Sequence, residues 1–328
     1  MKLVKSACTN LLFPESRKSI DAFRAAAEAV RAAGFEAMEF YHDGEGRGKI
    51  GEALAAAGLQ GVYIAVIAHK EGRLHLCDVE PEGRKKALEL AGACLLEAAD
   101  QGVPEVMFNS GAIREDNISG GLDALYASFC ELYNVTIKKK LDLRLLMEPC
   151  DSRMDARQLI GPTARTLKFM RRMDEAGVPL RLTLDSAHTV EEGEDFFETV
   201  RRLKPWCNQI HYANCVIADE TDPLFGDRHV SFGHPGGVFD APALRALTAR
   251  TIEEALANGA AKKSVDLRRH VPEGTFRFAP EPVSRALREA VLNALEAVPE
   301  RGGRITARGF VEKGALVLEI ADNGPGVA

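Results

Sequence analysis

Carboxylate and imidazole side chains stand where several short apolar runs of the chain end. Glu148, Asp185 and His211 close three such runs. The same series includes five further residues: His69, Asn109, His188, Asp227 and His229. Carboxylates and imidazoles that converge from separate segments can hold a divalent cation, and this mixture of oxygen and nitrogen ligands suits Mn, Zn, Co or Mg. The pattern therefore predicts a divalent-metal site.

Each of these residues also has a simpler explanation when it is taken alone. An aspartate at the end of a strand commonly caps the following helix, and a histidine there commonly faces solvent. Such explanations are harder to sustain for eight residues that end consecutive segments. We therefore favour a metal site, or the remnant of one, over unrelated capping groups.

The first two thirds of the chain alternate short β-rich runs with longer helical segments. Seven runs are predicted strands: residues 2–9, 36–42, 61–69, 105–111, 143–149, 180–188 and 208–215. Helical periodicity covers, among others, residues 19–34, 81–102, 122–140 and 156–177. The last residues of three of these helices, Gly34, Gly102 and Gly177, are expected to be left-handed C-caps.

The predicted strands are apolar on both faces, as in a parallel sheet covered by helices. Their regular alternation with helices predicts a (β/α)8 barrel of the TIM type, in which catalytic groups lie at the C-terminal ends of the strands. An eighth strand should follow the helix predicted at residues 240–251, but no apolar run ending in an acid is found there. The barrel is therefore expected to lack a normal eighth strand. We place a domain boundary at residue 250, with a second domain over residues 251–328.

Four stretches resemble the xylose isomerase-like TIM barrel superfamily, which contains sugar and sugar-phosphate isomerases and epimerases and a group of DNA repair endonucleases. They are MEP at Glu148, LDSAH from Asp185, IHYANC at His211 and GDRHVSFGHPGG around Asp227. The resemblance covers residues 1–248. In the epimerase branch it implies that Glu148, Asp185 and His211 hold the metal and that His188 meets the substrate.

The activity that this resemblance implies is proton transfer next to the carbonyl of a small sugar or sugar phosphate, through an enediolate. Glu148 would be both ligand and base, and His188 a second catalytic residue. Substrate contacts would come from the remaining residues of the series: His69, Asn109, Asp227 and His229. The family's eighth-strand glutamate has no clear counterpart, which puts the isomerase activity in question.

The DNA repair branch implies a cluster of three zinc ions, for which His69, His188, His211, Asp227 and His229 are candidates. Asn109 stands where that branch would have another histidine. The chain has 42 Lys and Arg against 48 Asp and Glu, a formal net charge of −6. This balance does not provide the basic surface of a nucleic-acid-binding protein. We therefore expect a small-molecule sugar as the partner and no nucleic acid.

The C-terminal segment resembles the ATP-binding domain of histidine kinases, of the GHKL type, over residues 252–328. REAVLNALEAV places Glu289 and Asn293 on one helical face, and ADNGPGV carries Asp322, Gly324 and Gly326. In that family the asparagine binds Mg²⁺, the aspartate binds adenine, and the glycines let the backbone approach the nucleotide. The resemblance implies a partial α/β domain with an incomplete Mg-ATP site. The two strands within residues 303–322 are expected to form a hairpin around the turn EKG.

Composition excludes other classes of protein. The 328 residues are 46% hydrophobic, which is enough for a large core, and no apolar run reaches the roughly 18 residues that a membrane span needs. Seven cysteines without a CxxC pair are expected to be thiols in a reducing cytoplasm. Oligomerisation remains possible. The alternatives to a sugar isomerase are a nucleotide-binding signalling fragment and a non-catalytic fusion or chimera.

Overall fold

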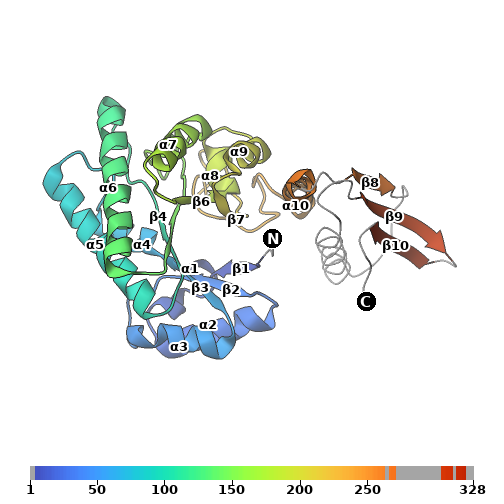
Figure 1. Ribbon diagram of the computed structural model, residues 1–328, viewed down its shortest axis with the longest axis horizontal. Helices are drawn as coiled ribbons and strands as arrows, with labels where there is room; N and C mark the ends of the chain where they lie inside the picture. Colours follow the sequence, from blue (N-terminus) through green and yellow to red (C-terminus); the bar gives the residue numbers. More distant parts are fainter. Residues whose placement is uncertain (1–3, 263–265, 271–303, 313–314, 323–328) are drawn as a thin grey trace. The chain divides into compact units, whose positions relative to one another are not determined.

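The structure is a computed structural model that describes residues 4–262, 266–270, 304–312 and 315–322 (Figure 1). The chain divides into one compact unit that extends to Arg245 and a second that begins at Ala246. This division lies close to the boundary proposed at residue 250.

Seven parallel strands form the sheet of the first unit, and their order in the sheet is their order in the chain. They are β1 Ser6–Cys8, β2 Ala37–Phe40, β3 Gln60–Ile64, β4 Glu105–Phe108, β5 Arg144–Met147, β6 Arg181–Asp185 and β7 Cys207–His211. Each lies within one of the seven predicted strands or overlaps it closely. The prediction of a parallel sheet with βα connections is therefore confirmed.

Helices follow the strands along the chain. The α-helices are α1 Thr9–Leu12, α2 Ile20–Ala32, α3 Ile50–Ala57, α4 Ala65–Gly72, α5 Pro81–Asp100, α6 Ile118–Lys139, α7 Thr163–Glu175, α8 Ser186–Glu191, α9 Phe196–Leu203 and α10 Ala241–Lys262. Short 3-10 turns are η1 Pro14–Arg17, η2 Arg47–Lys49 and η3 Glu115–Asn117. Gly34, Gly102 and Gly177 follow α2, α5 and α7 with φ values of 82°, 65° and 69°, as expected of left-handed C-caps.

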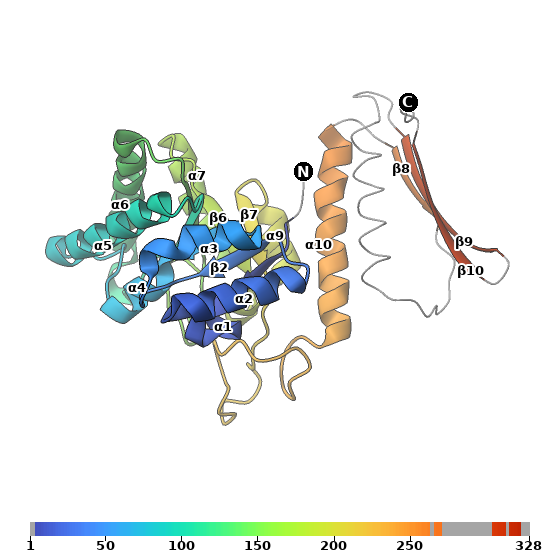
Figure 2. The ribbon, with the colours of Figure 1, turned by 90° about the horizontal axis from the view of Figure 1, so that it is seen from below.

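The helices cover the sheet with their apolar faces. In α2 the buried side chains are Phe23, Ala26, Ala27 and Val30, which recur at helical spacing. Helix α2 packs beside α3, and α5 packs beside α6 (Figures 1 and 2). Phe23 contacts Phe40 of β2 edge-to-face, with ring centroids 5.3 Å apart. The core therefore lies between the sheet and these helices.

Contacts between side chains of strands that are not neighbours show that the sheet curves strongly. Glu39 of β2 contacts His211 of β7 at 2.8 Å, although five strand positions separate the two strands. In a flat sheet these strands would be about 24 Å apart, at roughly 4.8 Å per strand. At the opposite end of the strands, Asn208 of β7 donates to Glu105 of β4 at 3.1 Å. The seven strands thus enclose an interior, as in a TIM-type barrel.

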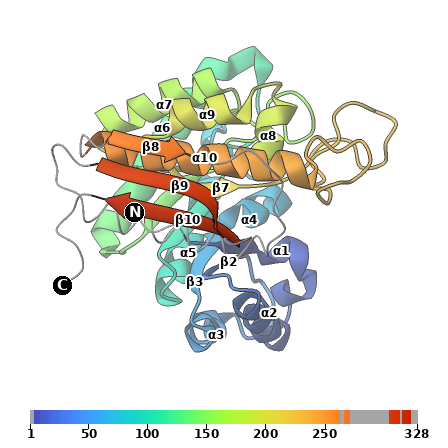
Figure 3. The same ribbon diagram turned by 90° about the vertical axis from the view of Figure 1, so that its right-hand side faces the viewer.

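No eighth strand joins this sheet within the described residues. The next strand, β8 Asp266–His270, pairs instead with β9 Arg304–Glu312 in the second unit. Strand β9 also pairs antiparallel with β10 Ala315–Asp322, so these three strands form a separate sheet (Figure 3). The β9–β10 pairing confirms the predicted hairpin.

The described residues also bear on the predictions that no segment spans a membrane and that the cysteines are free thiols. None of the described helices is long and apolar enough to cross a membrane. All seven cysteines are free thiols, and four of them are buried: Cys77, Cys94, Cys150 and Cys215.

A candidate metal centre at the ends of strands β5, β6 and β7

Three polar side chains lie together at the C-terminal ends of consecutive strands. Glu148 directly follows β5, and Asp185 and His211 are the last residues of β6 and β7. Asp185 and His211 are paired in the parallel register, and the Glu148 N–H donates to the Phe108 carbonyl at 2.8 Å. Because parallel strands end at one edge of the sheet, these side chains enter the same region.

The three side chains are close enough to share one cation. His211 Nδ1 lies 2.9 Å from Glu148 Oε1 and 3.7 Å from Asp185 Oδ2. One potential ligand atom of each residue lies within 4.8 Å of those of the other two. Glu148 and Asp185 are 7% and 1% exposed, so the group is nearly closed to solvent. The structure therefore brings together the three residues that the sequence suggested as ligands.

The two oxygens of Asp185 have different surroundings. Oδ1 accepts from the N–H groups of Ala187 and His188 at 2.7 and 3.2 Å and so caps helix α8. Oδ2 has no hydrogen-bond partner in the described part of the chain, although it is buried. A buried carboxylate oxygen without a hydrogen-bond partner is costly. It is a natural position for a cation ligand.

Glu39 lies on the other side of the His211 ring and was not anticipated from the sequence. Its Oε2 lies 2.8 Å from His211 Nε2, and the residue is only 2% exposed. The signal that could have revealed it is an acid within the apolar run AMEF, since buried carboxylates need a partner.

Charges determine the protonation of these groups. Burial alone would lower the pKa of His211, but the carboxylates of Glu39 and Glu148 raise that pKa well above its ordinary value. Burial opposes ionisation of Glu39, yet the charge and hydrogen bond of His211 bring the pKa of Glu39 below its usual range. The Glu39 carboxylate and the His211 imidazolium therefore form a buried ion pair.

A second group, which we name the His188 cluster, adjoins the first and consists of His188, Glu191, Asp227 and His229. His188 Nδ1 lies 3.3 Å from Glu191 Oε2 and 3.9 Å from Asp227 Oδ1. His229 Nε2 lies 3.1 Å from the same oxygen of Asp227. Potential ligand atoms of Asp185, His188 and His229 also lie within 4.8 Å of one another. Asp185 thus links the two groups, and the structure places predicted residues 188, 227 and 229 together.

The pKa directions in the His188 cluster follow from its charges. Burial would lower the pKa of His188, but its contacts with Cys150, Glu191 and Asp185 raise it well above the usual value. Burial opposes ionisation of Asp227, but His229 and His188 hold its pKa well below the ordinary range. Burial raises the pKa of the neighbouring Cys150 thiol to about 12. This cysteine is therefore a neutral, core-type residue rather than a thiolate nucleophile.

His69 does not reach either group, and the sequence-based position for it was wrong. Strand β3 ends at Ile64, and His69 lies in helix α4. Its Nδ1 and Nε2 lie 3.0 and 3.1 Å from the carbonyl oxygens of Ala65 and Ala87, and its ring packs edge-to-face on Phe108. Its role is to join α4 to α5. Asn109 does lie directly after β4, where it is partly buried.

We expect His69→Ala to lower stability without affecting the metal centre. The variant removes a buried ring, its contact with Phe108 and its hydrogen bonds to two helical carbonyls, and should cost about 2–3 kcal/mol of unfolding free energy. Thermal unfolding and metal content of the purified variant test this. Loss of a bound ion in a folded His69→Ala chain would show that the histidine belongs to the site after all.

The loop after β5 is fixed by one buried carboxylate. Asp151 is fully buried, and its side chain accepts hydrogen bonds from four successive backbone N–H groups, those of residues 153–156. Ser152, the next residue, donates both its N–H and its hydroxyl to Glu192. These bonds determine the path of the chain immediately beyond Glu148.

Asp151→Ala is expected to destabilise this loop and the fold. Charge-assisted hydrogen bonds to several amides would be lost, at about 2–3 kcal/mol, which corresponds to a fall of about 5–10 °C in Tm. The matched control is Asp155→Ala in the same loop, where the carboxylate makes a surface ion pair with Arg228 at 3.4 Å. Equal Tm values for the two variants would contradict this account.

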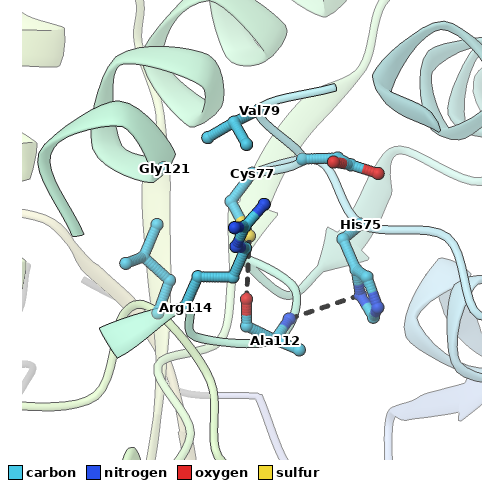
Figure 4. A pocket seen from close by; sticks show the side chains of 8 residues that line it. His75, Cys77, Val79, Ala112, Arg114 and Gly121 are labelled. Carbon is cyan, nitrogen blue, oxygen red and sulfur yellow. Dashed lines mark hydrogen bonds between the residues drawn. The ribbon is translucent and has the colours of Figure 1, made fainter. Parts of the chain in front are cut away.

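A small cavity lies apart from both groups. Its volume is about 220 Å³, and its lining includes His75 and Cys77 from the loop between α4 and α5, and Ala112 and Arg114 from the loop that follows β4 (Figure 4). The N–H of Ala112 donates to His75 Nδ1, and the Cys77 thiol donates to the Ala112 carbonyl, both at 3.3 Å. None of the candidate ligands lines this cavity.

Comparisons with known proteins agree with this architecture. A family model described as "Xylose isomerase-like TIM barrel" matches residues 27–253. A search of curated proteins found no match.

Similar solved structures include 3-keto-D-glucoside 4-epimerase from E. coli, with a TM-score of 0.56 and 15% identity over 90% of this chain and 99% of that one. A D-tagatose 3-epimerase-like protein has a TM-score of 0.59 and 14% identity over 90% and 98% of the two chains. D-psicose 3-epimerase from Clostridium cellulolyticum H10 has a TM-score of 0.51 and 16% identity over 64% and 73%. At these identities the likeness shows the fold alone.

Proposed function

Because this chain belongs to the xylose isomerase-like TIM barrel family, we propose that it is a divalent-metal-dependent isomerase or epimerase of a small sugar or sugar phosphate. The observation that carries the proposal is the convergence of Glu148, Asp185 and His211 at the C-terminal ends of β5, β6 and β7. Active sites of TIM barrels lie at this end of the strands. Several structures with a similar fold are of sugar epimerases, which agrees with this class of substrate.

The residues present fit a divalent cation. They offer two carboxylates and one imidazole, and Asp185 Oδ2 is buried with no hydrogen-bond partner among the described residues. This donor set suits Mn, Zn, Co or Mg. When bound, such an ion supplies Lewis-acid polarisation of the carbonyl and hydroxyl oxygens of the sugar.

Glu148 is the candidate base for the carbon-bound proton next to the carbonyl. It is 7% exposed, so a substrate at this position would exclude water from its carboxylate. His188 is the second catalytic candidate, because its ring lies at the adjoining cluster and its raised pKa keeps a proton available. Asp227 and His229 would bind sugar hydroxyl groups beside it.

The partner acid of the family, a glutamate on the eighth strand, is not found among the described residues. Epimerisation requires a proton to leave one face of the sugar and return to the other, so a second acid is needed. Within the described chain, His188 is the proposed residue for that role. Aldose–ketose isomerisation, by contrast, can proceed with a base on one face only.

The His188 cluster also keeps a second candidate open. A phosphodiester hydrolase of the DNA repair branch would place a further ion among Asp185, His188 and His229. The position of His69 inside α4 and the net charge of −6 argue against it. More than one ion per chain would favour this hydrolase.

The proposed ATP site remains without support. Glu289, Asn293, Gly324 and Gly326 lie outside the described residues, and Asp322 is the last residue of β10. The family match ends at residue 253, and so it gives no evidence for a kinase-like domain.

The experiment that tests the function starts from a chain stripped of metal by a chelator. The stripped chain is reloaded with Mn²⁺, Co²⁺, Zn²⁺ or Mg²⁺ and incubated in D2O with a panel of ketoses and aldoses. We expect interconversion of at least one pair of sugars, dependent on the added ion, with deuterium appearing at the carbon next to the carbonyl. If no ion produces a new sugar or any deuterium exchange, the proposal is wrong.

A further inference from the structure

Glu39 is a buried carboxylate that the proposed proton transfer does not use. It lies on β2, all four of whose residues are buried. A carboxylate in such a strand is costly unless it has a specific partner. The partner here is His211, which the fold brings from β7 across the interior of the barrel.

The His211 ring is held between carboxylates at its two nitrogens. Nε2 lies 2.8 Å from Glu39 Oε2, whereas Nδ1 lies 2.9 Å from Glu148 Oε1. A carboxylate is only an acceptor, so each ring nitrogen can donate a proton to the carboxylate that it faces. A cation held by Glu148 and Asp185 would replace the proton on Nδ1, whereas Glu39 keeps the proton on Nε2.

Glu39 itself is not placed as a ligand. Among the described residues, the groups whose ligand atoms lie within 4.8 Å of one another contain Glu148, Asp185 and His211 but never Glu39. Its contact is with the far nitrogen of the ring. The arrangement is that of a carboxylate that orients a metal-binding histidine, fixes its tautomer and increases its basicity.

We propose that Glu39 is a positioning residue: by accepting the Nε2–H of His211 it turns Nδ1 toward Glu148 and Asp185 and so completes the metal centre. This inference rests on the metal site of the proposed function. The orientation of His211 matters more in a site with few anionic ligands, and the described chain contributes no eighth-strand acid to this group.

The first test compares Zn²⁺ affinity of the full chain with Glu39→Gln and Glu39→Ala, by competition with a chromophoric chelator. Loss of an orienting partner typically costs 10–100-fold in metal affinity. We expect about 10-fold weaker binding in Glu39→Gln, which keeps an acceptor oxygen, and up to about 100-fold in Glu39→Ala. Glu105→Gln is the matched control, because it makes the same change at the opposite end of the strands. Its affinity should equal that of the wild type.

A second readout needs no variant at position 39. In the Zn²⁺-loaded wild type labelled with ¹⁵N-histidine, the His211 resonances should show a proton on Nε2 and none on Nδ1. The assignment comes from their loss in His211→Gln. This readout decides the question even if Glu39→Ala fails to fold.

The results of these experiments distinguish a failure of the role proposed for Glu39 from a failure of the proposed function. Zn²⁺ affinity within twofold of the wild type in both Glu39 variants, or a proton-free Nε2, would overturn the role of Glu39. Intact Zn²⁺ binding without turnover of any sugar would overturn the proposed function alone. A wild-type chain that binds no Zn²⁺ would overturn both.

Discussion

Replacing Glu148 with glutamine is expected to abolish turnover and to weaken metal binding. The substitution keeps the size of the side chain but removes a negative ligand 2.9 Å from His211 Nδ1. It also removes the proposed base, and positioned acid–base groups contribute about 10²–10⁴-fold to rate. We expect kcat/KM for the active sugar to fall at least about 10³-fold, with less than one ion retained per chain after dialysis.

The control for Glu148→Gln is again Glu105→Gln, since Glu105 begins β4 at the other end of the barrel. That variant should keep both its ion and its rate. Circular dichroism and Tm show whether each variant is folded. A folded Glu148→Gln chain that keeps wild-type turnover would remove Glu148 from the mechanism.

Replacing His188 with glutamine should have a different signature. The ion is expected to remain, because Glu148, Asp185 and His211 still supply their donor atoms. Turnover should fall by about 10²-fold or more, since a buried proton donor is lost. Metal content and kcat/KM, measured on the same preparation, test this separation of roles.

His234→Gln is the matched control for His188→Gln. His234 is partly exposed and lies 3.9 Å from Asp222, outside both groups. That variant should keep wild-type metal content and kcat/KM. If His188→Gln also lost the ion, His188 would be a ligand rather than a substrate contact. A wild-type rate would exclude it from catalysis.

Much of the barrel could be predicted from the sequence, because its strands are short apolar runs that end abruptly in polar residues. MEP and LDSAH show this clearly, since β5 ends one residue before Glu148 and β6 ends at Asp185. In a parallel sheet such ends share one edge, so proximity of the side chains follows from the order of the elements. Glycine C-caps similarly located the ends of α2, α5 and α7.

The sequence does not show where a strand ends and a helix begins when the residues on both sides of that boundary are equally apolar. The run GVYIAVIAH is uniformly apolar, but the chain leaves β3 at Ile64 and enters α4 at Ala65. A short apolar run does not distinguish a strand from a buried helix. His69 was therefore placed at the end of a strand when it lies inside a helix.

Contacts across the barrel were not predictable in the same way. Glu39 and His211 are 172 residues apart in sequence, and their strands are not neighbours in the sheet. Only the curvature of the sheet brings them together, and no local pattern encodes it. Asp185, by contrast, is shared through local structure: its Oδ2 faces His211, and its Oδ1 caps helix α8, which carries His188.

The metal centre is tested most directly by the number of ions bound to the purified wild-type chain, measured by elemental analysis after loading and dialysis. We predict close to one divalent ion per chain, because Glu148, Asp185 and His211 form one group of donors. No bound ion, even after incubation with Mn²⁺ or Zn²⁺, would contradict the metal centre and with it the proposed isomerase.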